Sequence, residues 1–190
     1  MRSTVARLAS AAAAKARPTL KGAVFDVDGT LTRPNIDFAA MYQRVGVNPA
    51  HDILVAVAAK PPTERKAAEA IIEQMESESR DSLELMPGAA NLIAWLHARG
   101  VRTAVVTRNT ELTIDKVTSL LAAEELIHAP CFDPAVSRDH PLPSKPDPAS
   151  LHLIAEAWGI DVDASAGAPR SSGLVMIGDS PTNDVAFGKA

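Results

Sequence analysis

The stretch that decides the fold of this chain reads Ala23-Val24-Phe25-Asp26-Val27-Asp28-Gly29-Thr30-Leu31-Thr32. Its apolar, β-rich first half predicts a strand over about residues 22–28, which Gly29 then breaks. An unbroken apolar run of this kind is typical of a central strand in a parallel sheet that is covered on both faces.

Two carboxylates, Asp26 and Asp28, stand at the end of this expected strand. Because they crowd one small site, they repel each other unless one is protonated or both share a cation. Mg²⁺ suits such a pair, since it prefers oxygen ligands. Taken alone, the stretch fits a solvated turn at a surface strand end equally well, so the rest of the chain has to decide.

The composition is that of one α/β domain with an inserted segment. The 190 residues can bury a sizeable core. A formal net charge of −4 gives no reason to expect a nucleic-acid partner. No run approaches the ~20 apolar residues that span a bilayer, so we expect a soluble protein without a membrane partner. The single cysteine, Cys131, excludes an internal disulfide and is expected to be a small buried residue.

The first 21 residues form a basic extension without acidic side chains. This composition fits a transit peptide, which would direct the protein to mitochondria or plastids. It also fits a short, frayed helix before the first strand of a cytoplasmic protein. Both interpretations remain open at this point.

Residues 33–85 predict a helical insertion, because three amphipathic stretches follow one another without a strand signal. Such a cap could lie over the acidic pair, exclude water and select the substrate. The alternative is that these helices are ordinary crossovers packed on the sheet. The acids Asp37, Asp52 and Glu76–Glu78 are expected on solvated helix faces. Four basic residues could contact a distal charge of the substrate but fit a solvated surface better: Arg33, Lys60, Arg65 and Arg80.

The core resumes at residue 86 with a helix, a buried strand over residues 102–107 and a second helix. Asn109 is expected to be the N-cap of that second helix. In such a βαβ unit, Thr107 should lie at the carboxyl edge of the sheet beside Asp26, where ligand sites of open α/β sheets form.

A weaker strand is expected near residues 132–137, followed by Lys145 among three prolines. The prolines fix the backbone and would aim the lysine with little entropic loss. Asp147 and Pro148 should be the N-cap and first turn of the next helix.

After a loose loop over residues 161–172, a further buried strand at 174–177 leads into Gly178-Asp179 and, five residues later, Asp184. The chain stops at Ala190, inside a helix expected to begin near Asn183. We therefore expect a truncated C-terminus that lacks one or more strands.

Four motifs now stand in order: Asp26-Val27-Asp28-Gly29-Thr30, Thr107 after an apolar strand, Lys145 in Lys-Pro-Asp-Pro, and Gly178-Asp179 with Asp184. Together they resemble the haloacid dehalogenase superfamily, and most closely its phosphoglycolate-phosphatase-type members. The resemblance implies an α/β fold, a Rossmann-like three-layer parallel sheet with a small helical cap after the first strand. The core would comprise residues 22–32 and 86–190, and the cap is shorter than is usual for that group.

The resemblance also implies roles for individual residues. Asp26 would be the nucleophile that forms an aspartyl-phosphate, and Asp28 the general acid and then the base. Lys145 would neutralise negative charge, and Thr107 would bind a phosphoryl oxygen. Substrate binding would fall to Gly29, Thr107, Arg108, Asn109 and Lys145. The Mg²⁺ cofactor would be held by Asp26, Asp28 (through its backbone carbonyl), Asp179 and Asp184.

The expected activity is Mg²⁺-dependent hydrolysis of a small phosphorylated metabolite. Asp28 favours a phosphatase over a dehalogenase, because a halide leaves without a proton. The alternatives are a phosphomutase or phosphotransferase of the same superfamily, and a non-catalytic binding protein on an inactive or truncated fold. The sequence does not indicate an oligomeric state.

Overall fold

The structure, a computed structural model, describes residues 20–127, 130–160, 162–163, 170–171 and 173–189. The two interpretations of the basic extension concern a segment that lies almost entirely outside these residues. Among the helices in these ranges, none is both long and apolar enough to cross a lipid bilayer.

The core is a parallel sheet with the strand order β3-β2-β1-β6. Its strands are β1 (Gly22–Phe25), β2 (Arg102–Val106), β3 (Ala135–Val136) and β6 (Leu174–Ile177). Phe25 is in register with Val105 on one side and Ile177 on the other, so the carboxyl ends of the three longer strands lie level. The side chains that follow these strands therefore meet at one edge.

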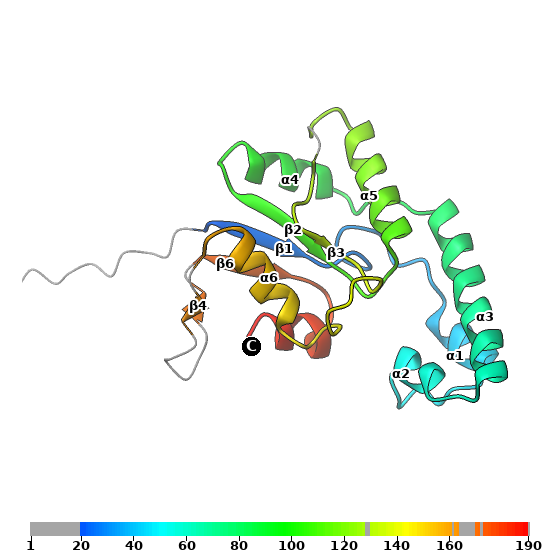
Figure 1. The fold of residues 1–190 in the computed structure, drawn as a ribbon. Helices are drawn as coiled ribbons and strands as arrows, with labels where there is room; N and C mark the ends of the chain where they lie inside the picture. Colours follow the sequence, from blue (N-terminus) through cyan, green and yellow to red (C-terminus); the bar gives the residue numbers. More distant parts are fainter. Residues whose placement is uncertain (1–19, 128–129, 161, 164–169, 172, 190) are drawn as a thin grey trace, which may run out of the picture.

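Helices cover both faces of the sheet, which confirms the predicted three-layer arrangement (Figure 1). Ala23 and Phe25 point to the face that carries α4 (Ala89–His97) and α5 (Glu111–Ala123). Val24 points to the opposite face, which carries α6 (Ala149–Ala157). This alternation along one strand explains why the sequence of β1 is apolar throughout.

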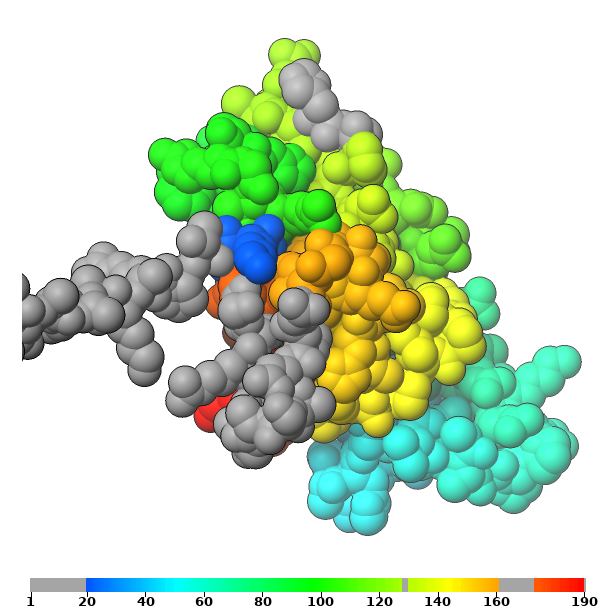
Figure 2. Space-filling view, turned by 60° about the vertical axis from the view of Figure 1, so that its left-hand side comes forward, coloured from blue at the N-terminus to red at the C-terminus, as the bar shows by residue number. Residues whose placement is uncertain are grey.

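The segment between β1 and α4 folds into three helices with a small core of their own. They are α1 (Phe38–Val45), α2 (Ile53–Ala58) and α3 (Pro62–Asp81). This cap forms a lobe at one end of the molecule, drawn in cyan and blue-green in Figure 2. Its buried residues are Met41, Val45, Ile53, Val57, Ala68 and Ile72.

Two linkers join the cap to the core, and hydrogen bonds connect the first linker with the second and with the end of α3. The backbone N–H of Arg33 donates to the carbonyl of Glu84 at 2.9 Å. The Asn35 amide donates to the carbonyl of Ser79 at 2.8 Å. These bonds hold the base of the cap together, so the lobe has a defined point of attachment beside Asp28.

Several local predictions were wrong. The N-cap of α5 is Thr110, one residue later than expected, although Asn109 Oδ1 still accepts the Thr110 N–H at 3.3 Å. The N-cap of α6 is Pro148, also one residue later than expected, and the Asp147 side chain accepts the Ala149 N–H. Strand β6 is an edge strand of the described sheet with Val175 39% exposed, so its apolar run does not signal full burial.

Two C-terminal predictions also need correction. The expected loose loop contains β4 (Val162–Asp163), which pairs antiparallel with β5 (Arg170–Ser171); the rest of that segment lies outside the described residues. The last turn begins at Pro181 as a π-helix, η2 (Pro181–Val185), because the Ser180 side chain accepts the backbone N–H of Asn183 and caps it.

Candidate active site

The side chains that follow the parallel strands line a cavity of about 290 Å³ between the sheet edge and the cap. Asp26 and Asp28 come from the end of β1, Thr107 from the end of β2, and Asp179 from the end of β6. The structure thus brings nearly all the sequence-predicted site residues together. The cavity lining includes Asp26, Asp28, Gly29, Thr107, Arg108, Asn109, Lys145 and Asp179. Asp184 is the exception, since it lies behind Lys145 and is 1% exposed.

Lys145 bridges two of the carboxylates. Its Nζ lies 2.7 Å from Asp26 Oδ1 and 2.6 Å from Asp184 Oδ1. The lysine side chain is only 2% exposed, so this cation compensates negative charge where water cannot. Lys145 lies in a turn of the proline-rich loop before α6.

Asp26 is a carboxylate in a buried environment. Burial raises its pKa from 3.8 to about 6, although the charge and hydrogen bond of Lys145 pull in the opposite direction. Its backbone N–H donates to the carbonyl of Ile177 at 2.9 Å, which extends the β1–β6 pairing by one residue. The side chain therefore has a fixed position and ionises in the mildly acidic range.

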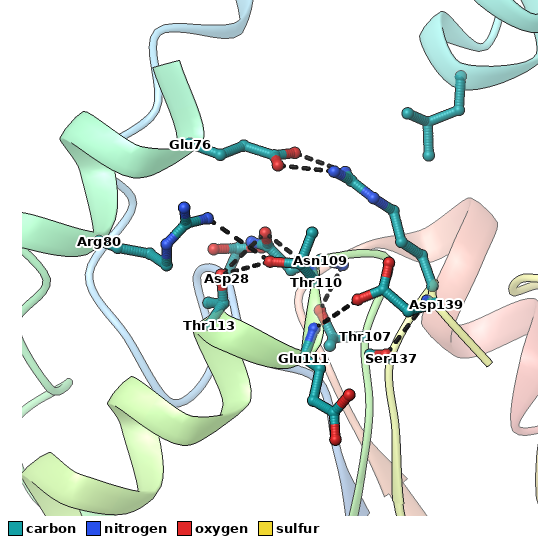
Figure 3. Close-up of polar contacts among 12 residues, drawn as sticks. Asp28, Glu76, Arg80, Thr107, Asn109, Thr110, Glu111, Thr113, Ser137 and Asp139 are labelled. Carbon is teal, nitrogen blue, oxygen red and sulfur yellow. Dashed lines mark hydrogen bonds and ion pairs between the residues drawn. The ribbon is translucent and has the colours of Figure 1, made fainter. Parts of the chain in front are cut away.

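Asp28 is held by a hydrogen bond from the Asn109 amide at 2.9 Å (Figure 3). Asn109 is oriented in turn by the Thr113 hydroxyl, which donates to its Oδ1 at 3.1 Å. Burial raises the pKa of Asp28 above its ordinary value; the Asn109 bond opposes this shift, and the negative charge of Glu76 adds to it. A raised pKa favours the protonated form, which a proton donor requires.

Asp26, Asp179 and Asp184 each offer a carboxylate oxygen, and these oxygens lie within 4.8 Å of one another. Three clustered carboxylates are the donor set of a hard divalent cation such as Mg²⁺. Both oxygens of Asp184 already have partners, Lys145 at 2.6 Å and the Ser180 N–H at 3.0 Å. Asp184 is thus suited to support the shell, and the Asp28 side chain, held by Asn109, lies outside the cluster.

Two glycines make room for these acids. Gly29 has φ of 74°, and a Cβ there would lie 2.3 Å from Asp179 Oδ2. A Cβ at Gly178 would lie 2.3 Å from Cγ of Asp184. The Asp-x-Asp-Gly pattern thus needs glycine for backbone conformation and for close approach of another acid, a reason that cannot be read from the sequence.

Two ion pairs join the cap to the core around the cavity, and the sequence analysis missed both. Arg108 after β2 pairs with Asp52, which also caps α2 by accepting the Leu54 and Val55 N–H groups. Arg138 after β3 pairs with Glu76 of α3 through both nitrogens, at 2.5 and 2.7 Å. The prediction that Asp52 and Glu76 are merely solvated was wrong, and Glu76 is only 6% exposed.

The four basic residues of the insertion that the sequence singled out do not line the cavity; they are Arg33, Lys60, Arg65 and Arg80. Arg33 pairs with Glu84 and Arg65 with Glu69, all largely exposed. Arg80 donates to the Thr110 hydroxyl at 3.5 Å. These four residues therefore fit surface positions better than contacts with a substrate in the cavity. Arg138 carried no sequence signal, because it stands alone after a two-residue strand.

The haloacid dehalogenase-like hydrolase family model matches residues 60–190. The chain belongs to this family. A haloacid dehalogenase-like hydrolase domain-containing protein of Arabidopsis thaliana is 35% identical over 185 residues, which are 92% of this chain and 69% of that protein. The family membership confirms the predicted resemblance and makes the protein a hydrolase.

Two further proteins extend the comparison. The phosphoglycolate phosphatase of Rhodospirillum rubrum is 36% identical over 104 residues, 55% of this chain and 37% of that protein. The crystal structure of a hydrolase from Pseudomonas syringae has a TM-score of 0.66 at 16% identity, covering 88% of this chain and 80% of that one. At that identity the structural similarity supports the fold alone, and the fold is the predicted one.

Proposed function

We propose that this haloacid dehalogenase-like hydrolase is a Mg²⁺-dependent phosphatase that cleaves a small phosphomonoester through an aspartyl-phosphate on Asp26. The observation that carries the proposal is the pairing of two different carboxyls at one strand end. Asp26 has a cation, Lys145, at 2.7 Å, and Asp28 has a raised pKa and a hydrogen bond from Asn109. One is suited to attack and the other to donate a proton. The phosphatase named among the relatives supports the same class.

In the first step, a carboxylate oxygen of Asp26 attacks phosphorus and the ester P–O bond breaks. Asp28 gives its proton to the leaving alkoxide, which would otherwise be a poor leaving group. Asp28 then takes a proton from water, the hydroxide attacks phosphorus, and inorganic phosphate leaves as the Asp26 carboxylate is regenerated.

Charge on the transferring group is balanced by groups already in position. Lys145 lies beside Asp26, and Thr107, 4% exposed, follows β2 with its hydroxyl accepting the Asn109 N–H at 3.0 Å. Arg108, Asn109 and Gly29 also line the cavity and would complete the substrate-binding surface. Mg²⁺, held by Asp26, Asp179 and the backbone carbonyl of Asp28 with Asp184 in support, would neutralise negative charge as the anions approach each other.

The experiment is phosphate release from a panel of small phosphomonoesters, in Mg²⁺ and in EDTA. We expect release in Mg²⁺ and none in EDTA. Adding a sugar phosphate as a possible acceptor distinguishes hydrolysis from phosphotransfer, because a phosphomutase or phosphotransferase would transfer the phosphoryl group to this acceptor instead of to water. A chain that is folded by circular dichroism yet releases no phosphate from any ester would overturn the proposal.

Gly29→Ala is expected to lower activity and thermal stability more than Gly46→Ala does. Both glycines have positive φ, 74° and 64°, so both substitutions impose a similar backbone strain. At Gly46 nothing lies within 4 Å of an added Cβ, whereas at Gly29 it would meet Asp179. The difference in melting temperature and in the Mg²⁺ concentration for half-maximal rate measures the displacement of Asp179. Equal losses in the two variants would show that Asp179 does not depend on this space.

In EDTA, the contribution of Asp26 to the free energy of unfolding is expected to fall between about pH 4 and pH 6. Its folded-state pKa of about 6 lies above the ordinary 3.8, so the protonated form stabilises the fold at low pH and this stabilisation is lost as the pH rises. Urea unfolding across this range should show a difference between the wild type and Asp26→Asn that changes with pH. The exposed Asp147→Asn should follow the wild type. Parallel curves for wild type and Asp26→Asn would contradict the raised pKa.

A further inference from the structure

Every cationic side chain that lines the cavity is already paired with a carboxylate. In the described residues these cations are Lys145, Arg108 and Arg138. Lys145 contacts Asp26 and Asp184 in the phosphoryl-transfer centre. The two arginines lie toward the cap, where the leaving group of a substrate would be, so their pairing decides which leaving groups fit.

Arg138 and Glu76 form a bidentate ion pair. Two parallel hydrogen bonds join the guanidinium to both carboxylate oxygens, as the two dashed lines at Glu76 in Figure 3 mark. The Glu76 side chain is 8% exposed and that of Arg138 21%. An anion that took Arg138 from Glu76 would leave a buried carboxylate without a partner, which is strongly unfavourable.

The pair between Arg108 and Asp52 is also neutral, but it is nearer to water. Burial acts to raise the pKa of Asp52, yet the N–H of Val55 and the guanidinium of Arg108 outweigh it and hold the pKa below its ordinary value. Asp52 is therefore ionised at neutral pH and cancels the charge of Arg108. Its side chain is 36% exposed, so a substitution at Asp52 is easier to accommodate than one at Glu76.

Apolar side chains of the cap and of the linker before it make up much of the remaining lining. Tyr42 adds an aromatic ring whose hydroxyl donates to the carbonyl of His51 at 3.0 Å. A neutral, apolar wall favours ligands that bury carbon rather than charge. The apolar lining residues are Pro34, Ile36, Phe38, Met41, Ile53, Leu54 and Ile72.

We propose that the leaving group of the substrate is uncharged and in part apolar, and that Asp52 and Glu76 exclude substrates with a second anionic group. The inference rests on the proposed phosphatase function and narrows its substrate class. It also implies that phosphoglycolate, which the name of the Rhodospirillum rubrum relative gives as its substrate, is a poor substrate for this chain. The leaving group of phosphoglycolate carries a carboxylate. Such a carboxylate would meet the like charges of Asp52 and Glu76, and among the described residues the arginines on that side of the cavity are already paired with these two acids.

The test compares esters that differ only in this charge. Two acid–amide pairs of esters are compared. The first is 2-phosphoglycolate with 2-phosphoglycolamide, and the second is 4-carboxyphenyl phosphate with 4-carbamoylphenyl phosphate. We expect kcat/KM for each amide to exceed that for its acid by roughly tenfold or more. Equal rates, or faster hydrolysis of the acids, would overturn the inference while leaving the phosphatase proposal intact. Absence of phosphate release from every ester would instead contradict the phosphatase proposal.

Asp52→Asn gives the inference a second, gain-of-function test. Asparagine is as good an N-cap as aspartate, so α2 keeps its cap while Arg108 gains a free positive charge. The amide-to-acid ratio should fall by roughly tenfold. Asp37→Asn is the matched control, because Asp37 caps α1, is exposed and does not line the cavity. A ratio that stays at the wild-type value in Asp52→Asn would show that this pair does not exclude anions.

Discussion

Asp26→Asn is expected to lower kcat for phosphate release by on the order of 10³-fold or more while the fold is retained. The amide keeps the shape of the carboxylate but lacks the nucleophilic oxygen charge. It also leaves the hydrogen bond of the Asp26 backbone N–H to Ile177 untouched. The measurement is steady-state phosphate release with Mg²⁺ on the best ester of the panel, beside circular dichroism of the same preparations.

Asp147→Asn is the matched control for this substitution. Asp147 is exposed, and an asparagine can still accept the Ala149 N–H that Asp147 accepts at 3.0 Å. We expect wild-type turnover from it. If Asp26→Asn also turned over at the wild-type rate, Asp26 would not be the nucleophile.

Lys145→Met is expected to lower both activity and stability. The buried ammonium compensates Asp26 and Asp184, and methionine of similar length would leave two carboxylates side by side. Removing one partner of a buried ion pair costs about 3–5 kcal/mol of unfolding free energy. Loss of a charge aimed at the transferring group lowers kcat by about 10²–10³-fold. Urea unfolding in EDTA and phosphate release in Mg²⁺ measure the two effects.

The loss of stability should depend on pH and on Asp184. Lys145 lowers the pKa of Asp26 against the effect of burial, so the variant should have a higher Asp26 pKa and lose more stability at pH 8 than at pH 5. The double variant Lys145→Met, Asp184→Asn should regain part of the stability but none of the activity. Lys66→Met, on the exposed face of α3, should match the wild type. A Lys145→Met protein as stable as the wild type at pH 8 would contradict this electrostatic account.

The sheet and its acidic edge could be predicted from the sequence because their signals are local. The apolar run of β1 fixes a covered strand, and the chemistry of Asp26, Asp28 and Asp179 follows directly after strand ends. Since parallel strands share one carboxyl edge, placing the strands also brings these side chains together. The prolines around Lys145 gave a comparable local signal.

The contacts between cap and core could not be predicted in the same way. Asp52 and Glu76 look like ordinary surface acids of a helix, and only the position of the cap sets them against Arg108 and Arg138. Asn109 looks like an ordinary residue at a helix start, and only the position of Asp28 shows that the Asn109 amide also holds a carboxylate of the site. These contacts join segments far apart in the sequence, and the helix and strand propensities of single segments do not predict such contacts.

The central claim is that the phosphoryl group resides on Asp26, and trapping that intermediate tests it most directly. The protein would be mixed with Mg²⁺ and an ester that it hydrolyses, and the reaction would be quenched with borohydride. Borohydride reduces an aspartyl-phosphate to homoserine, which peptide mass spectrometry then detects. We predict homoserine at position 26, and none there without the ester or in Asp26→Asn. Efficient phosphate release with aspartate unchanged at position 26, or with homoserine at another position, would contradict the account.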